Sequence, residues 1–177
     1  AFGTALARNN AGEQALPFLD LATKLYEQVS QTVPDRKSAL ASFYARQGNG
    51  DKTFELLSEV QPTPDELAEI GQSALQSRKL SKSQIEQLIA LVKAMFEQHP
   101  DNLNIGLCLG DLYGWIVDWK NAAETYRQVL KAHPDQFVAL NNLAMVLASS
   151  QQDLAAAKAA INQAIAVMGP RDFLLDT

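Results

Sequence analysis

Apolar side chains recur at intervals of three and four residues along most of the chain, with polar residues between them. The clearest runs cover residues 103–116 and 119–132. This spacing places the apolar side chains on one face of a helix, so it predicts two amphipathic helices. Residues 117–118 connect them, and Pro134 ends the second helix. Because no alternation of apolar and polar residues between tight turns is found, the sequence predicts an all-α fold.

A repeated tripeptide marks the boundaries of this helix pair. His-Pro-Asp occurs at 99–101 and again at 133–135, a separation of 34 residues. Repeats of this length are typical of helical solenoids, in which each unit buries its apolar face against its neighbours. The unit that begins at Leu103 resembles a tetratricopeptide repeat (TPR) in bacterial-type arrays. It departs from the family pattern at Gly106 and Val129, and it matches at Leu109, Gly110, Tyr113, Trp119, Ala122, Tyr126 and Pro134.

The resemblance extends more weakly over the rest of the chain. It divides residues 1–177 into a single array with repeats at about 1–34, 35–63, 64–100, 101–136 and 137–170. The unit at 64–100 carries about five extra residues, which we expect to lengthen the turn around 77–82. Residues 171–177 look like the start of a truncated further repeat, which suggests a piece cut from a longer protein. The implied fold is a right-handed α-solenoid of antiparallel helix pairs.

The amino-acid composition supports a helical fold and excludes several classes of function. The chain has 26 Ala, 24 Leu and 15 Gln against 16 Val plus Ile, and the former lose less side-chain freedom in a helix. Its net charge of -5 argues against nucleic acid, which requires a clustered basic surface. One cysteine and two histidines exclude thiolate zinc clusters and three-histidine metal sites. No apolar stretch is long enough for a membrane span.

Few features point to catalysis. His-Pro-Asp is also the signature of J-domain cochaperones. Both copies here stand where the second helix of a repeat ends, which favours a role as helix terminator. The series Gly106, Gly110 and Gly114 resembles a membrane dimer motif, but the segment also holds Asp111 and Asp118. The better interpretation is that Gly110 lets the partner helix approach closely. Cys108 lies mid-helix among apolar residues and beside an acid, which favours a packed thiol over a nucleophile. We therefore predict no enzyme activity, no metal and no cofactor.

The TPR resemblance implies a concave groove lined by the first helix of each repeat. Its partner-binding residues would include Asn104, Leu107, Asp111, Trp115, Asn141, Asn142, Met145 and Arg46. The tryptophan and the methionine could anchor apolar groups, and asparagine amides could bond a peptide backbone. Lys and Arg are absent from the positions where TPR domains hold the C-terminal carboxylate of chaperones. A basic or apolar segment therefore suits the groove better.

The resulting hypothesis is a non-catalytic scaffold that binds a protein or peptide partner. Two alternatives stay open: a self-assembly module that dimerises through uncapped end helices, and a regulatory or spacer segment of a larger protein. No targeting signal lies in these residues, which leaves the compartment undecided, with the cytoplasm favoured over the periplasm.

Overall fold

The computed structural model describes residues 21–25, 27–28, 36–150 and 153–168. All regular structure in this part of the chain is helical, and no strand occurs in it. The helices are α3 (Lys37–Gln47), α4 (Gly50–Glu59), α5 (Pro64–Ser77), α6 (Lys82–Gln98), α7 (Leu103–Trp115), α8 (Trp119–Ala132), α9 (Phe137–Ser150) and α10 (Leu154–Met168). The all-α prediction is confirmed, and so are the helices predicted at 103–116 and 119–132. Most of the predicted unit at 1–34, and residues 171–177, lie outside the described residues.

Polar side chains define where the helices begin. Thr63 and Ser81 each form a capping box, with Glu66 and Gln84 respectively. Such boxes satisfy two backbone N–H groups that a helix start leaves without partners. The side chains of Asn49, Asn102 and Asp118 each accept a bond from the backbone N–H three residues ahead, at the starts of α4, α7 and α8. The two predicted terminators are confirmed, because His99 is the C-cap residue of α6 and His133 is the C-cap residue of α8.

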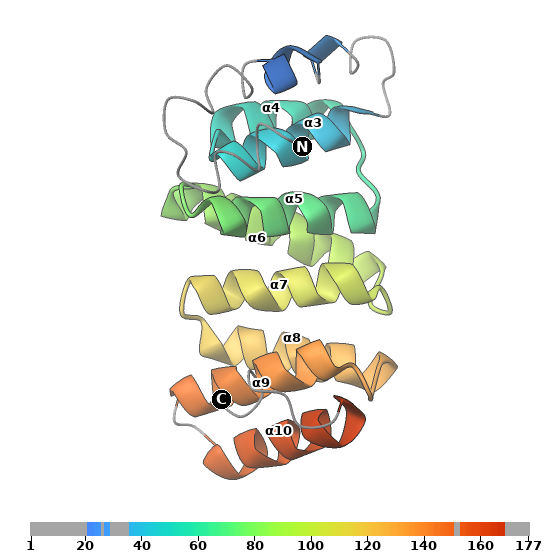
Figure 1. Ribbon diagram of the computed structural model, residues 1–177, viewed down its shortest axis with the longest axis vertical. Helices are drawn as coiled ribbons and strands as arrows, with labels where there is room; N and C mark the ends of the chain where they lie inside the picture. Colours follow the sequence, from blue (N-terminus) through green and yellow to red (C-terminus); the bar gives the residue numbers. More distant parts are fainter. Residues whose placement is uncertain (1–20, 26, 29–35, 151–152, 169–177) are drawn as a thin grey trace.

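The helices stack in antiparallel pairs along the long axis of the molecule, from α3 and α4 to α9 and α10 (Figure 1). We call α3, α5, α7 and α9 the first helices, and α4, α6, α8 and α10 the second helices. The first helices α3, α5 and α7 pack on one another in order, while α9 packs mainly on α8 and α10. The largest apolar cluster runs between the two layers from Ala41 to Ala160, so the core is continuous along the array.

The extra residues at 64–100 are placed differently from the sequence expectation. The connection 78–81 is only one residue longer than 116–118, and α5 is one residue longer than α7 (14 against 13). Most of the insertion lies in α6, which has 17 residues against 14 in α8. The turn prediction was therefore wrong in detail: the residues after Ser81 follow a helical apolar pattern and extend the second helix.

Two glycines of α7 let the neighbouring second helices approach closely. A Cβ atom at Gly106 would collide with Val129 and Phe96, and one at Gly110 would collide with the ring of Tyr126. Nothing lies within 4 Å of such an atom at Gly114. The close-packing interpretation is confirmed for Gly110, and the structure adds Gly106 to it.

Candidate binding surface

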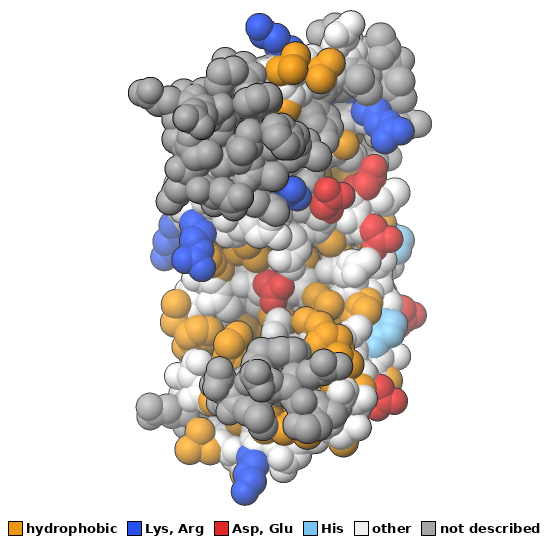
Figure 2. All heavy atoms as spheres, viewed as in Figure 1, with side chains coloured by type: hydrophobic (Ala, Val, Ile, Leu, Met, Phe, Trp, Pro, Cys, Tyr) orange, Lys and Arg blue, Asp and Glu red, His pale blue; other side chains and the backbone are white. Residues whose placement is uncertain are grey.

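The predicted groove residues lie on the first helices, on a surface that we call the first-helix face. Asn104 is exposed, and so are Trp115 and Met145, with 43% and 49% of their surface accessible. Leu107, Asp111, Asn141, Asn142 and Arg46 are partly buried. Figure 2 views this face: apolar side chains gather over its lower half, and Asp and Glu lie mostly along its right side, with one acidic side chain near the middle.

Asp111 is the centre of a polar network on this face. Its Oδ1 accepts bonds from the hydroxyl of Tyr126 at 2.5 Å and from the Nδ2 of Asn142 at 3.0 Å. Its Oδ2 accepts a bond from the Nε2 of Gln72 at 2.7 Å. These partners lie on α8, α9 and α5, so one carboxylate joins four helices of three successive pairs. Sequence reasoning placed Asp111 and Asn142 in the groove but missed Tyr126, whose repeat position indicates only core packing.

Burial around Asp111 keeps two neighbouring groups neutral. The pKa of Tyr126 is raised, first because the ring is buried and then because the carboxylate of Asp111 lies beside it. Burial, followed by the same carboxylate, also raises the pKa of the Cys108 thiol. Cys108 has no exposed surface and packs against Gly71 of the preceding pair. The packed-thiol interpretation is confirmed, since a nucleophilic cysteine requires exposure and a lowered pKa.

A second group of amides surrounds Asp65, in the first turn of α5. Its Oδ1 accepts bonds from the Nδ2 of Asn104 at 3.0 Å and from the Nδ2 of Asn102 at 3.1 Å. These bonds lower the pKa of Asp65, with Asn104 the larger cause. The carboxylate is exposed to solvent.

Arg46 lies apart from these residues, at the junction of α3 and α5. Its Nη2 donates to the hydroxyl of Ser73 at 3.2 Å, and that hydroxyl shares a 2.9 Å bond with Ser42. Ser42 also donates to Glu69 at 3.2 Å. The sequence could not reveal that Arg46 bonds to Ser73 of the next first helix, because the register of α3 on α5 decides it.

Trp115 lies at the end of α7 and is partly covered by a cation. The guanidinium of Arg78 lies over its ring, 5.9 Å from the centroid. Arg78 ends α5 in the left-handed conformation, with φ at 54°, and this conformation carries the chain from α5 into the connection to α6. A cation at this distance is attracted by the ring, which steadies the indole while leaving its other surface accessible.

Two further features bear on chemistry. In the described part of the chain, no group of three or more His, Cys, Asp or Glu side chains is arranged to hold a metal ion. None of the helices in the same residues is both long and apolar enough to cross a membrane.

Antiparallel helix pairs, stacked around a continuous core with the first helices on one face, define the class of the molecule. It is a helical repeat solenoid of the TPR type.

Solved structures with this fold include YrrB, described as a TPR protein with an unusual peptide-binding site. It superposes with a TM-score of 0.66 at 12% identity, over 99% of this chain and 87% of its own. MamA superposes with a TM-score of 0.64 at 14% identity, over 88% of this chain and 91% of its own. TTC0263, a thermophilic TPR protein of Thermus thermophilus, gives 0.61 at 19% identity, over 92% and 90%. No protein-family model matches the sequence, and no curated protein matches it significantly.

Proposed function

We propose that the chain is a non-catalytic interaction scaffold whose first-helix face binds an extended segment of a partner protein. The observation that carries this proposal is the exposure of Trp115 and Met145 on the same face as the Asp111 network. Large apolar side chains in water are unfavourable, and aromatic side chains dominate the energy of protein interfaces. The peptide-binding site described for YrrB, which shares the fold, supports the same use of this one.

The Asp111 network prepares the face for binding. The bond from Asn142 to Asp111 fixes the amide of Asn142, so less side-chain freedom is lost when a peptide binds. An asparagine amide both donates and accepts, as a peptide backbone does. Asn104 and Asn141 extend this amide-rich surface on α7 and α9.

Charge selects the chemistry of the segment. From α5 onward, every charged residue of the first helices is acidic: α5 carries Asp65, Glu66 and Glu69, α7 carries Asp111, and α9 carries none. The cations Lys37 and Arg46 lie on α3, away from Trp115 and Met145 in the sequence of helices. A segment with an apolar side chain for Trp115 or Met145 and a nearby Lys or Arg fits this distribution. We expect its binding to weaken as salt rises, because exposed ion pairs are screened.

The test begins with peptides selected from a displayed random library on the whole chain. Affinities are then compared for wild type and for Trp115→Ala combined with Met145→Ala. We expect a loss of about 2 kcal/mol or more, roughly 30-fold, because truncated anchors at interface centres cost this much. Val167→Ala on α10, which removes part of another exposed apolar side chain, is the matched control and should leave affinity unchanged.

Equal affinity in the double variant and in the control would reject the first-helix face as the binding surface. Adding Asn142→Ala to the double variant measures how much the amide of Asn142 contributes to the affinity beyond the two apolar anchors. Self-assembly through end helices and a spacer role in a larger protein stay predictions, and sedimentation over a range of concentrations tests the first.

A further inference from the structure

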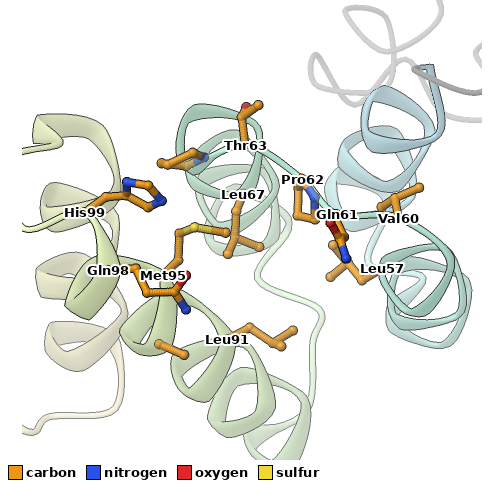
Figure 3. Close-up of a pocket in the computed structure, with 12 residues that line it drawn as sticks. Leu57, Val60, Gln61, Pro62, Thr63, Leu67, Leu91, Met95, Gln98 and His99 are labelled. Carbon is orange, nitrogen blue, oxygen red and sulfur yellow. The ribbon is translucent and has the colours of Figure 1, made fainter.

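An open cavity lies away from the first-helix face, between the second helices α4 and α6. It is an open cleft of about 620 Å³, which we call the second-helix cleft. Figure 3 shows Leu91, Met95 and Gln98 of α6 facing Leu57 of α4 and the connection 60–63, with Leu67 of α5 at the base. The volume lies within the range of ordinary ligand pockets.

Unequal helix lengths create this cleft. α4 has 10 residues and ends at Glu59, after which Val60 is extended, with φ at -127° and ψ at 160°. α6 has 17 residues, so at 1.5 Å per residue it is about 10 Å longer than α4. The C-terminal half of α6 is therefore left uncovered by its neighbour.

That uncovered half presents a helical apolar stripe. Leu91, Ala94, Met95 and Gln98 are spaced i, i+3, i+4 and i+7, and all four line the cleft. Leu91 is 42% exposed and Met95 is partly buried, whereas Ile85, Leu88, Ile89, Val92 and Phe96 of the same helix are buried. The stripe has the form of a binding face for another segment.

The lining of the cleft contains no Asp, Glu, Lys or Arg. A second cavity, between α6 and α8, offers an internal comparison: it measures about 280 Å³, and its lining includes Lys93, Glu97 and Glu124. A gap between two second helices of this array can therefore be lined by charged residues, so the uncharged lining of the second-helix cleft is a specific feature. An uncharged lining fits an uncharged occupant, because a buried charge without a partner is costly.

Polar groups at the rim are free to bind a backbone. The side chains of Gln61 and Gln98 make no hydrogen bond with the described part of the chain. His99 differs from its repeat counterpart: the Nε2–H of His133 donates to the backbone oxygen of Asp101 at 2.8 Å, whereas the ring of His99 has no such partner in the same residues and lines the cleft. Each of these groups can donate or accept.

We propose that the second-helix cleft is a separate docking site for an uncharged, apolar segment of a partner protein, whose backbone bonds to Gln61, Gln98 and His99. The site is distinct from the first-helix face, and one chain can hold two partner segments on opposite layers. Apolar side chains of the segment fill the space beside Leu91 and Met95.

The test uses displayed random peptides selected on the whole chain, with counter-selection on Ala94→Arg. An arginine at this position fills the cleft and adds charge, and folding should survive because Ala94 is exposed and arginine is a good helix former. The matched control is Ala90→Arg, the same change at an exposed alanine of the same helix outside the lining. Circular dichroism and thermal unfolding verify both variants.

We expect selected peptides to share an uncharged apolar run. Ala94→Arg should weaken their binding about ten-fold or more, and Ala90→Arg less than about two-fold. Leu91→Gln, which removes an apolar contact without adding charge or bulk, should weaken it too. The Trp115→Ala, Met145→Ala variant should bind these peptides as wild type does, which separates this site from the first-helix face.

Three results would overturn the proposal. The first is a selection that yields no peptide dependent on Ala94. The second is a set of peptides that lose affinity through Trp115 and Met145 instead. The third is a selection that yields no peptide while the neutral dye Nile red binds the wild type and not Ala94→Arg. That result would assign the cleft to a small apolar molecule.

Discussion

At the scale of single residues, the stability of the fold is most sensitive to change where a side chain is buried beside a polar neighbour. Cys108 and Tyr126 both lie against Asp111, and both have raised pKa values because burial disfavours their charged forms. The glycines of α7 are sensitive for another reason, since a neighbouring side chain occupies the space of a Cβ atom.

Raising the pH should destabilise the chain through Cys108. Above about pH 8.5 the unfolded thiol loses its proton, while the folded thiol keeps it. The unfolded state then binds fewer protons, so the free energy of unfolding falls by up to about 1.4 kcal/mol per pH unit. Urea unfolding between about pH 8.5 and 10 measures this slope, and Cys108→Ala should reduce it. An unchanged slope would contradict the raised pKa, and a series below about pH 8 is the control.

Alanine at Gly110 and at Gly114 should have opposite effects. Gly110→Ala pushes a methyl group into the ring of Tyr126, which Asp111 holds in place, so we expect a loss of about 1–3 kcal/mol. Gly114→Ala meets nothing and gains helix propensity, so stability should rise by up to about 1 kcal/mol. Denaturant midpoints compare the two, and equal changes of the same sign would refute the packing argument.

At the scale of elements, Asp111 links helices that hydrophobic packing joins less directly. α9 packs mainly on α8 and α10, and the bond from Asn142 to Asp111 connects it to α7. The position of α9 relative to the other first helices therefore depends in part on this carboxylate.

Removing the carboxylate should cost stability through Tyr126. Asp111→Ala leaves the hydroxyl of a buried tyrosine without an acceptor, which costs about 1–3 kcal/mol. In Tyr126→Phe that hydroxyl is gone, so the further effect of Asp111→Ala should be smaller. A double-mutant cycle by denaturant unfolding should give a coupling of about 0.5–3 kcal/mol, and strictly additive losses would contradict the network.

At the scale of the whole molecule, stability is distributed along the array. Each helix contacts only its neighbours: α7 packs on α5, α6 and α8, whereas the main contact of α10 is α9. In such arrays stability is approximately a sum over units and their interfaces.

Native-state hydrogen exchange should therefore be uneven. We expect the backbone amides of α5 to α8 to be the most protected, and those of α10 to exchange through less costly openings, because α10 loses fewer contacts when it opens. Mass spectrometry of peptide fragments measures this order. Equal protection in α7 and α10 would indicate one cooperative unit instead.

Much of the helical architecture could be predicted from the sequence. The apolar spacing in 103–132 located α7 and α8, and the two His-Pro-Asp tripeptides marked helix ends, because both signals act within one or two turns of the chain. The candidate groove residues follow from the repeat register, so the sequence alone could predict them. The division into five units remains a prediction, since the first and last segments lie outside the described residues.

The sequence by itself determined the all-α class, the helix pairs and the buried faces, because these depend on local spacing, caps and composition. Only the tertiary structure decided which groups meet between helices. Tyr126, Asn142 and Gln72 meet on one carboxylate, and a short α4 beside a long α6 leaves an apolar cleft. Those features depend on helix lengths and on the register between neighbouring pairs. Such quantities are properties of the packed array, and no local stretch of sequence contains them.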